Sequence, residues 1–250
     1  MKKVDLLRKR VEDMRQTEVK DDEGKTITIG KLARREKKSL RVESAAMALI
    51  TTVLAMRQRW DETASPRVEA FKVKYPYVET LQDLKGLIDS MSEREFCKKV
   101  LDLNIKKTPF WRYVMLKNLI KAFAYYRTEK GFNDDWEAIQ DWAKKVDVGN
   151  LEDDMIGRIQ DVGPATLQNL RLICGIDTVK PDVHVKETLK DIGLGNEIEV
   201  VELLSELTGY SCVELDQIFW HWDKNRSKKD EITEEEFHKL PKMGLAQNNY

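Results

Sequence analysis

Apolar residues recur every three or four positions along most of the chain, and this period predicts helices. Residues 1–16 carry an apolar stripe on one side, formed by Val4, Leu7, Val11 and Met14. Residues 44–59 are apolar on nearly every side, so we expect this helix to be buried. Further helices are predicted at residues 66–75, 80–88, 92–101, 113–126, 134–142, 182–189, 200–207 and 213–222.

A different pattern covers residues 18–29, where polar and apolar side chains alternate around an Asp/Gly turn. This alternation predicts a small β-hairpin. Strand signals are scarce in the rest of the sequence. The predicted fold class is therefore all-α, with a small N-terminal β-hairpin.

The segment from Ile159 to Val185 combines a turn, a helix, a loop and an acidic residue that starts another helix. The first helix of a predicted helical hairpin covers residues 151–159, just before the turn. Gly163 can take the positive φ that a tight turn between two helices requires. Pro164 suits the first position of the second helix, which Gly175 ends. The start of a helix behind a glycine turn presents unpaired N–H groups, which favour an anion such as phosphate.

Two motifs in this segment resemble the helix-hairpin-helix DNA glycosylase superfamily, to which endonuclease III belongs. The hairpin motif matches at Ile159, Val162, Gly163 and Thr166, and the later motif matches at Asp182, His184 and Val185. The separation of the two motifs is close to that in the family. The chain departs from the family at two positions. Asp161 stands where the first hairpin glycine usually lies, and Ala165 stands where bifunctional members carry a Schiff-base lysine.

The resemblance implies a two-lobed helical bundle and divides the chain into three parts. Residues 1–41 form a basic N-terminal extension, and residues 42–224 form the glycosylase-like domain, with the hairpin at residues 151–175. Residues 225–250 form a charged C-terminal tail.

The resemblance also implies a function, that of a DNA base-excision repair glycosylase that flips a damaged base out of the duplex and cleaves its N-glycosidic bond. Asp182 is the candidate catalytic residue, because a fixed carboxylate can stabilise the positive charge on the sugar or activate water. Without an amine at Ala165, we expect a monofunctional enzyme that lacks Schiff-base lyase activity. One alternative is a catalytically inactive DNA-binding protein of the same fold. A second is a helical protein whose hairpin only joins two helices, with Asp182 acting solely as a helix N-cap.

Double-stranded DNA containing a damaged or mismatched base is the implied partner. By the resemblance, its contacts come from the hairpin, from the turn that follows the buried helix, and from the loop at residues 103–111. These contacts are Val162, Gly163, Ala165 and Thr166; Arg57, Gln58 and Arg59; and Phe110 and Trp111. The alternative is that the arginines are ordinary surface residues and that at least one of the two aromatic residues packs in the core. A monovalent cation at the hairpin, as in the family, would use the carbonyl groups of Gln160 and Val162.

The composition limits where DNA could bind. The 250 residues are 41% apolar and 35% charged, with a net charge of −1, so DNA binding requires a local basic surface. The basic cluster at residues 31–41 is either the solvated start of a helix or a set of phosphate contacts.

The cysteine count argues against an iron–sulfur protein, and the absence of long apolar runs argues against a membrane-spanning protein. Cys97, Cys174 and Cys212 lie far apart in the sequence, which predicts buried, reduced thiols and no four-cysteine iron–sulfur cluster; no other cofactor is expected. No apolar run is long enough to span a membrane, and the charged N-terminus is unlike a secretory signal. We therefore expect an intracellular monomer in the cytoplasm or nucleoid.

Overall fold

The structure is a computed structural model that describes residues 3–39, 41–104, 110–191 and 197–225. The chain divides into two compact units, and each is considered by itself. The middle unit comprises residues 40–177, and the terminal unit combines residues 1–39 with residues 178–250. The first 39 residues therefore pack with the segment that carries Asp182, a grouping that the sequence pattern does not indicate. The predicted tail beyond residue 225 lies outside the described residues.

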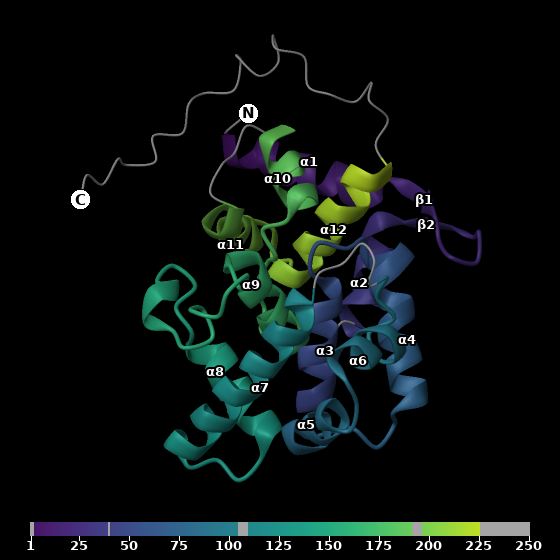
Figure 1. The fold of residues 1–250 in the computed structure, drawn as a ribbon. Coiled ribbons are helices and arrows are strands. Elements are labelled where there is room, and N and C mark those ends of the chain that lie inside the picture. The colour runs from purple at the N-terminus through teal and green to yellow at the C-terminus, as the bar shows by residue number, and fades with distance from the viewer. Residues whose placement is uncertain (1–2, 40, 105–109, 192–196, 226–250) are drawn as a thin grey trace. The chain divides into compact units, whose positions relative to one another are not determined.

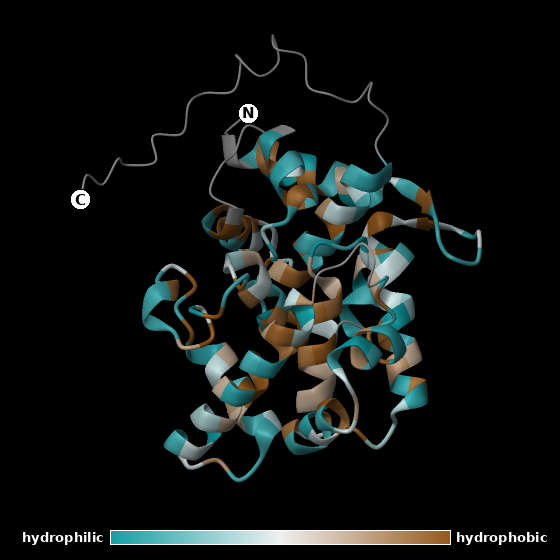
Figure 2. Cartoon of the chain, in the orientation of Figure 1, coloured by the Kyte–Doolittle hydropathy of each residue, from teal (hydrophilic) through white to brown (hydrophobic). Residues whose placement is uncertain are grey.

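The regular elements of the middle unit, in its described residues, are helices. They are α3 (Ala45–Ala55), α4 (Ser65–Lys74), α5 (Leu81–Asp89), α6 (Glu93–Lys99), α7 (Trp111–Lys130), α8 (Asp135–Lys145) and α9 (Pro164–Ile173). The α3 helix runs through the core and contacts α4, α5, α7, α8 and α9 (Figure 1). Its apolar surface is brown in Figure 2, whereas the helices around it carry hydrophilic residues on their outer sides. As its composition predicts, α3 is buried from Ala45 to Ala55, except at Met47.

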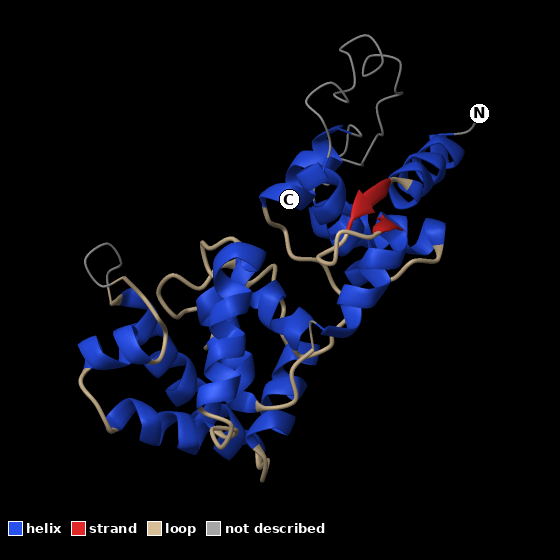
Figure 3. Cartoon of the chain, turned by 90° about the vertical axis from the view of Figure 1, so that its right-hand side faces the viewer, coloured by secondary structure: helices blue, strands red, loops and turns tan. Residues whose placement is uncertain are grey.

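The terminal unit contains α1 (Lys3–Gln16), β1 (Glu18–Lys20), β2 (Thr26–Thr28), α2 (Ile29–Ser39), α10 (Val183–Asp191), α11 (Glu197–Thr208) and α12 (Cys212–Asn225). The two strands form an antiparallel hairpin with Val19 opposite Ile27, beside α1 and α2 (Figure 3). The α12 helix packs against α1, α2, α10 and α11 and supplies Leu215, Ile218 and Phe219 to the core.

These elements confirm the predicted helical class and the small N-terminal β-hairpin. The boundary of the buried helix differs, because α3 ends at Ala55 and not near Arg59. Arg57 has a left-handed backbone φ of +53°, which is incompatible with a continuing right-handed helix. A short π-helical turn, Trp60–Ala64, then leads into α4. Among the described helices, none has both the length and the apolar character needed to cross a membrane.

Candidate nucleic-acid interface and candidate catalytic carboxylate

The hairpin turn of the middle unit is formed by Asp161, Val162 and Gly163. Asp161 has a left-handed φ of +67°, whereas Gly163 is extended, with a φ of −131°. The prediction that Gly163 supplies the positive φ is therefore wrong, and Asp161 supplies it. Aspartate fits this position because its short polar side chain tolerates the left-handed region better than most residues. The N–H of Val162, which is buried, donates to the Ile159 carbonyl at 3.0 Å and closes the turn.

The segment ahead of this turn is not the helix that the hairpin motif predicts. A short 3₁₀ turn covers only Leu151–Asp153, and successive turns follow it. Asp154 Oδ1 accepts hydrogen bonds from the N–H groups of Ile156 and Gly157, at 2.9 and 2.8 Å. A short acidic side chain that bonds its local backbone in this way competes with helix formation.

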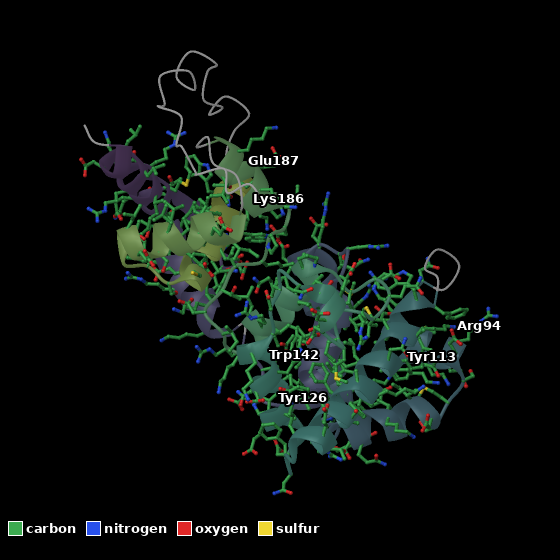
Figure 4. The ribbon with its side chains drawn as sticks, turned by 90° about the vertical axis from the view of Figure 1, so that its left-hand side faces the viewer. Arg94, Tyr113, Tyr126, Trp142, Lys186 and Glu187 are labelled. Atoms are coloured by element: carbon green, nitrogen blue, oxygen red, sulfur yellow. The ribbon has the colours of Figure 1, made fainter. Side chains whose placement is uncertain are left out.

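The same segment is anchored to α8. The indole N–H of Trp142 donates to Asp154 Oδ2 at 2.9 Å. Trp142 is buried in the core of the middle unit, against which Tyr126 also packs, and Figure 4 labels both residues. A Cβ atom on Gly157 would lie 2.6 Å from the Leu151 carbonyl oxygen, so this position requires glycine. The hairpin turn is therefore built on a fixed base.

The α9 helix starts directly behind the turn, with Pro164 in its first turn as predicted. The Gly163 carbonyl accepts hydrogen bonds from the N–H groups of Thr166 and Leu167, at 2.9 and 3.0 Å. The N–H of Ala165 lies in the first helical turn, where the helix itself offers no acceptor. A Cβ atom on Gly163 would meet nothing within 4 Å, so the backbone is open on this side. This geometry suits a phosphate oxygen.

Arg57 brings a positive charge to the turn. Its Nη2 lies 3.1 Å from Asp161 Oδ1, so the carboxylate that departs from the family pattern is neutralised by a guanidinium. The Arg57 side chain is 68% exposed and that of Asp161 is 26% exposed. A guanidinium has five N–H donors, and the single bond to Asp161 leaves others for a solvent-side anion.

Trp111 lies between two guanidinium groups at the start of α7. Its ring centroid is 5.3 Å from the guanidinium carbon of Arg57 and 4.4 Å from that of Arg112. Arg112 is buried and donates hydrogen bonds to the carbonyls of Val53 and Met56, at 3.2 and 2.5 Å. Burial, together with the charges of Arg67 and Arg57, lowers the pKa of Arg112 to about 10. Arg112 therefore satisfies carbonyls at the end of α3 and supports the turn that carries Arg57.

The other predicted DNA contacts of this unit differ in their surroundings. Gln58 is half-buried in the turn after α3. Arg59 is exposed, and its Nη1 donates to both carboxylate oxygens of Glu62 at 2.9 and 3.0 Å. Phe110 is 38% exposed next to Trp111, which is half-buried and packs against the core. Residues 105–109 of the predicted basic loop lie outside the described residues. Arg57 and Trp111 are thus brought together with the hairpin turn, while Arg59 is paired elsewhere.

Asp182 belongs to the terminal unit and stands immediately before α10. Its Oδ1 accepts hydrogen bonds from the N–H groups of His184 and Val185, at 3.0 and 3.2 Å. This is the geometry of a helix N-cap, which satisfies two amides in the first turn of α10. Within the described residues, no hydrogen bond reaches the second oxygen, Oδ2, and the residue is half-buried. One carboxylate oxygen is therefore fixed while the other is available.

The His184 side chain makes two contacts within the terminal unit. Its Nδ1 lies 2.7 Å from Asp223 Oδ2, and its ring meets Trp220 edge to face at 5.9 Å.

Asp216 is a buried residue of α12 that was not among the predicted site residues. Its Oδ1 accepts a hydrogen bond from the Lys180 N–H at 2.9 Å. Burial, with a further contribution from the charge of Asp182, raises the pKa of Asp216 to about 7.

The sequence pattern could have indicated that Arg112 and Asp216 are buried. Each is an ionisable residue placed on the apolar stripe of a helix. Arg112 precedes Met115, Leu116 and Leu119, while Asp216 lies between Cys212 and Phe219. Residues at these spacings share one helix face, so each charge must enter the core with partners.

Two residues of the basic cluster at residues 31–41 form hydrogen bonds within the terminal unit. Arg34 Nε donates to Glu214 Oε1 at 2.9 Å, and Lys37 Nζ donates to Ser211 Oγ at 2.6 Å. Both bonds join α2 to the start of α12. These contacts favour the structural interpretation of the cluster over a set of phosphate contacts.

The three cysteines and the hairpin carbonyls are the groups considered for a cofactor or metal in the sequence, and the cysteines are all free thiols. Cys97, Cys174 and Cys212 are buried thiols, and burial raises the pKa of Cys97 to about 11 and that of Cys174 to about 12. In the part of the chain that the structure describes, no three His, Cys, Asp or Glu residues gather as a metal site. The carbonyls of Gln160 and Val162 flank Asp161 in the turn, and cation binding there stays a prediction.

Comparison with models of protein families, with curated proteins and with solved structures gives no match to this chain. Function is therefore inferred from the motifs and contacts of the chain itself.

Proposed function

We propose that this chain is a DNA-binding protein of the helix-hairpin-helix glycosylase type that excises a base from duplex DNA. Two motifs support the proposal, the hairpin at residues 159–166 and the acidic motif at residues 182–185. The division into two helical units, one with the hairpin and the other with Asp182, is consistent with the two-lobed bundle that the resemblance implies.

Phosphate binding is proposed at the hairpin turn. The observation that carries it is the Arg57–Asp161 pair beside the open start of α9. An unpaired carboxylate at this turn would repel the DNA backbone, but the guanidinium cancels its charge and offers further donors. Hydrogen bonds of this charge-assisted type contribute about 1.5–3 kcal/mol each. The Ala165 N–H would add a backbone donor.

Trp111 and Phe110 supply the apolar part of the same surface. A base can stack on an exposed aromatic ring, and such stacking contributes about 1–3 kcal/mol per base. The exposed edge of Phe110 suits this role better than Trp111, which is held between two guanidinium groups. Gln58 lies in the turn next to Arg57, and by the resemblance it would enter the DNA helix beside the flipped base.

Base excision is proposed at Asp182. As the C1′–N bond of a flipped nucleotide breaks, its electron pair leaves with the base and positive charge develops on the sugar. The available Oδ2 of Asp182 can stabilise that charge, while the two amides bound to Oδ1 hold the carboxylate still. Water then forms the new bond to C1′ and gives up a proton, and the departing base takes one up.

The proposed reaction is monofunctional because Ala165 has no amine for an imine with the sugar. Lys180 and Lys186 flank Asp182 in the sequence, and Lys186 lies on α10 (Figure 4). Borohydride reduction on lesion-bearing DNA tests this point. We expect no trapped covalent adduct, and a trapped adduct would show that one of these lysines acts as a nucleophile.

The deciding experiment is a lesion panel. Duplexes carrying uracil, hypoxanthine, 8-oxoguanine or an alkylated base are incubated with the protein, and alkali then cleaves the abasic sites. We expect cleavage at one class of lesion, together with duplex binding that weakens steeply as salt rises. Salt-sensitive binding without cleavage would favour the catalytically inactive DNA-binding protein, an alternative motivated by Asp161 and Ala165. Absence of binding at low salt would contradict both.

A further inference from the structure

Two carboxylates of α12 flank the Asp182 turn. Asp216 Oδ1 accepts a hydrogen bond from the Lys180 N–H at 2.9 Å, and Asp223 Oδ2 lies 2.7 Å from His184 Nδ1. Lys180 is two residues before Asp182 and His184 is two residues after it. The turn is thus held on both sides by one helix, while the Asp182 side chain bonds the start of α10.

The spacing of these carboxylates follows from helix geometry. Asp216 and Asp223 are seven residues apart, which is close to two helical turns, so they share one face of α12. This face packs against α10, where Thr188 Oγ1 donates to the Phe219 carbonyl at 3.2 Å. Phe219 is fully buried in the core of the terminal unit. A packed helix is a rigid support for residues that must keep their position.

Asp216 is also electrostatically coupled to Asp182. Burial is the main reason for its raised pKa of about 7, and the Asp182 charge raises it further. The Lys180 N–H, the Lys180 charge and the Gln217 side chain act in the opposite direction. These are the groups that contribute most to the pKa of Asp216.

We infer that Asp216 and Asp223 are positioning residues that fix the Asp182 carboxylate from α12. The catalytic consequence rests on the proposed function, whereas the hold on the turn does not. Neither residue needs to touch DNA. The contribution of Asp216 acts through the Lys180 backbone, and that of Asp223 acts through the His184 ring.

The first experiment needs no lesion. Protein labelled with ¹⁵N-lysine is titrated by NMR, with the Lys180 amide assigned through Lys180→Arg. We expect the Lys180 amide shift of the wild type to change with a midpoint near pH 7. The change should be absent from Asp216→Asn and should move to lower pH in Asp182→Asn, because the repelling charge is gone. A wild-type shift without this midpoint, or an Asp182→Asn midpoint equal to that of the wild type, overturns the coupling.

The second experiment measures single-turnover excision and duplex Kd on the lesion that the wild type cuts. Misplacing a reacting group by about 1 Å can cost on the order of 100-fold, so we expect Asp216→Ala and Asp223→Ala to lose about 10- to 100-fold in rate. Their Kd should stay within about twofold of the wild type, because the hairpin is untouched. Asp216→Asn should recover most of the lost rate, since its amide oxygen still accepts the Lys180 N–H.

The matched control is Glu202→Gln, which changes an exposed carboxylate of α11 in the same unit. Wild-type rates in both alanine variants would overturn the positioning role, as would losses equal to those of the control. If the wild type cuts none of the lesions, the proposed function fails, but the amide titration still decides whether Asp216 holds the turn.

Discussion

Asp161 in the middle unit and Asp182 in the terminal unit occupy similar places, each close to the start of a helix, and their carboxylates are used in opposite ways. Asp182 accepts hydrogen bonds from two amides of α10 and so consumes the anion-binding capacity of that helix start. Asp161 instead has its carboxylate paired with Arg57 at 3.1 Å. The first turn of α9 keeps the Ala165 N–H for an external acceptor.

Aspartate thus serves two purposes in this chain. Where the backbone φ is left-handed, as at Asp161, the side chain turns to a cation and the helix start stays open. Where the residue is an N-cap, as at Asp182, the helix start holds the carboxylate in place. The first arrangement can accept an anion, and the second can present one. This contrast gives phosphate binding to the hairpin and charge stabilisation to Asp182 in the proposed function.

Substituting Asp182 tests the contrast most severely. Asparagine caps a helix about as well as aspartate, whereas alanine costs about 1 kcal/mol at an N-cap. If Asp182 presents its charge to the sugar, Asp182→Asn should lower excision by at least about 100-fold, the size of effect seen when a fixed electrostatic group is lost. Its melting temperature and duplex Kd should stay close to those of the wild type.

Asp182→Ala separates the two roles in the same assay. It should lose excision to the same extent and should also be less stable, because the cap is gone. If Asp182→Asn cuts DNA as fast as the wild type, Asp182 is only a helix N-cap, and its charge has no part in excision.

Asp216 offers a second test, through pH. Its folded pKa of about 7 lies above the ordinary value of 3.8, so the folded state binds the proton more tightly than the unfolded state. The stabilisation from this bound proton is full below about pH 4 and is lost as pH rises to about 7. The slope is at most about 1.4 kcal/mol per pH unit.

Urea unfolding of wild type and Asp216→Asn at pH 5 and pH 7 measures this effect. We expect the stability of the wild type relative to the variant to fall by about 1–2 kcal/mol between these pH values. A difference that does not change with pH would show that the carboxyl does not titrate in this range, and it would weaken the link between Asp216 and the Asp182 turn.

The sequence predicts much of this architecture because burial and periodicity are local signals. The period of the apolar residues indicates the helices, and alternation indicates the β1–β2 hairpin. The place of Pro164 at the start of α9 follows from backbone chemistry. The error at Gly163 arose because glycine is the usual residue for positive φ, whereas the local bonds place Asp161 there.

The contacts that define the two sites could not be predicted in this way. Arg57 and Asp161 are 104 residues apart, and no sequence period reports a pair across that distance. The same holds for Asp216 and the Lys180 N–H, 36 residues apart. Asp154 gives a local example of a wrong prediction. A helix was expected at residues 151–159, but Asp154 accepts hydrogen bonds from nearby amides, which competes with helix formation.

The Arg57–Asp161 pair provides the last test, with Arg59 as its control. Both arginines are exposed and two residues apart, but Arg59 is bonded to Glu62 while Arg57 faces the hairpin. Arg57→Ala should weaken duplex binding about tenfold, or about 1.4 kcal/mol, and reduce the slope of log K against log salt by about 1. Arg59→Ala should change the Kd by less than about threefold, because exposed charges with local partners contribute little.

A double variant shows whether the effect of Arg57 comes from neutralising Asp161 or from its own contact with DNA. If neutralisation dominates, adding Asp161→Asn to Arg57→Ala should restore most of the lost affinity, since asparagine tolerates the left-handed φ and carries no charge. If direct phosphate contact dominates, the double variant should bind as weakly as Arg57→Ala alone. Equal binding by wild type, Arg57→Ala and Arg59→Ala would instead place the DNA surface away from this turn, and the open start of α9 would then have no assigned ligand.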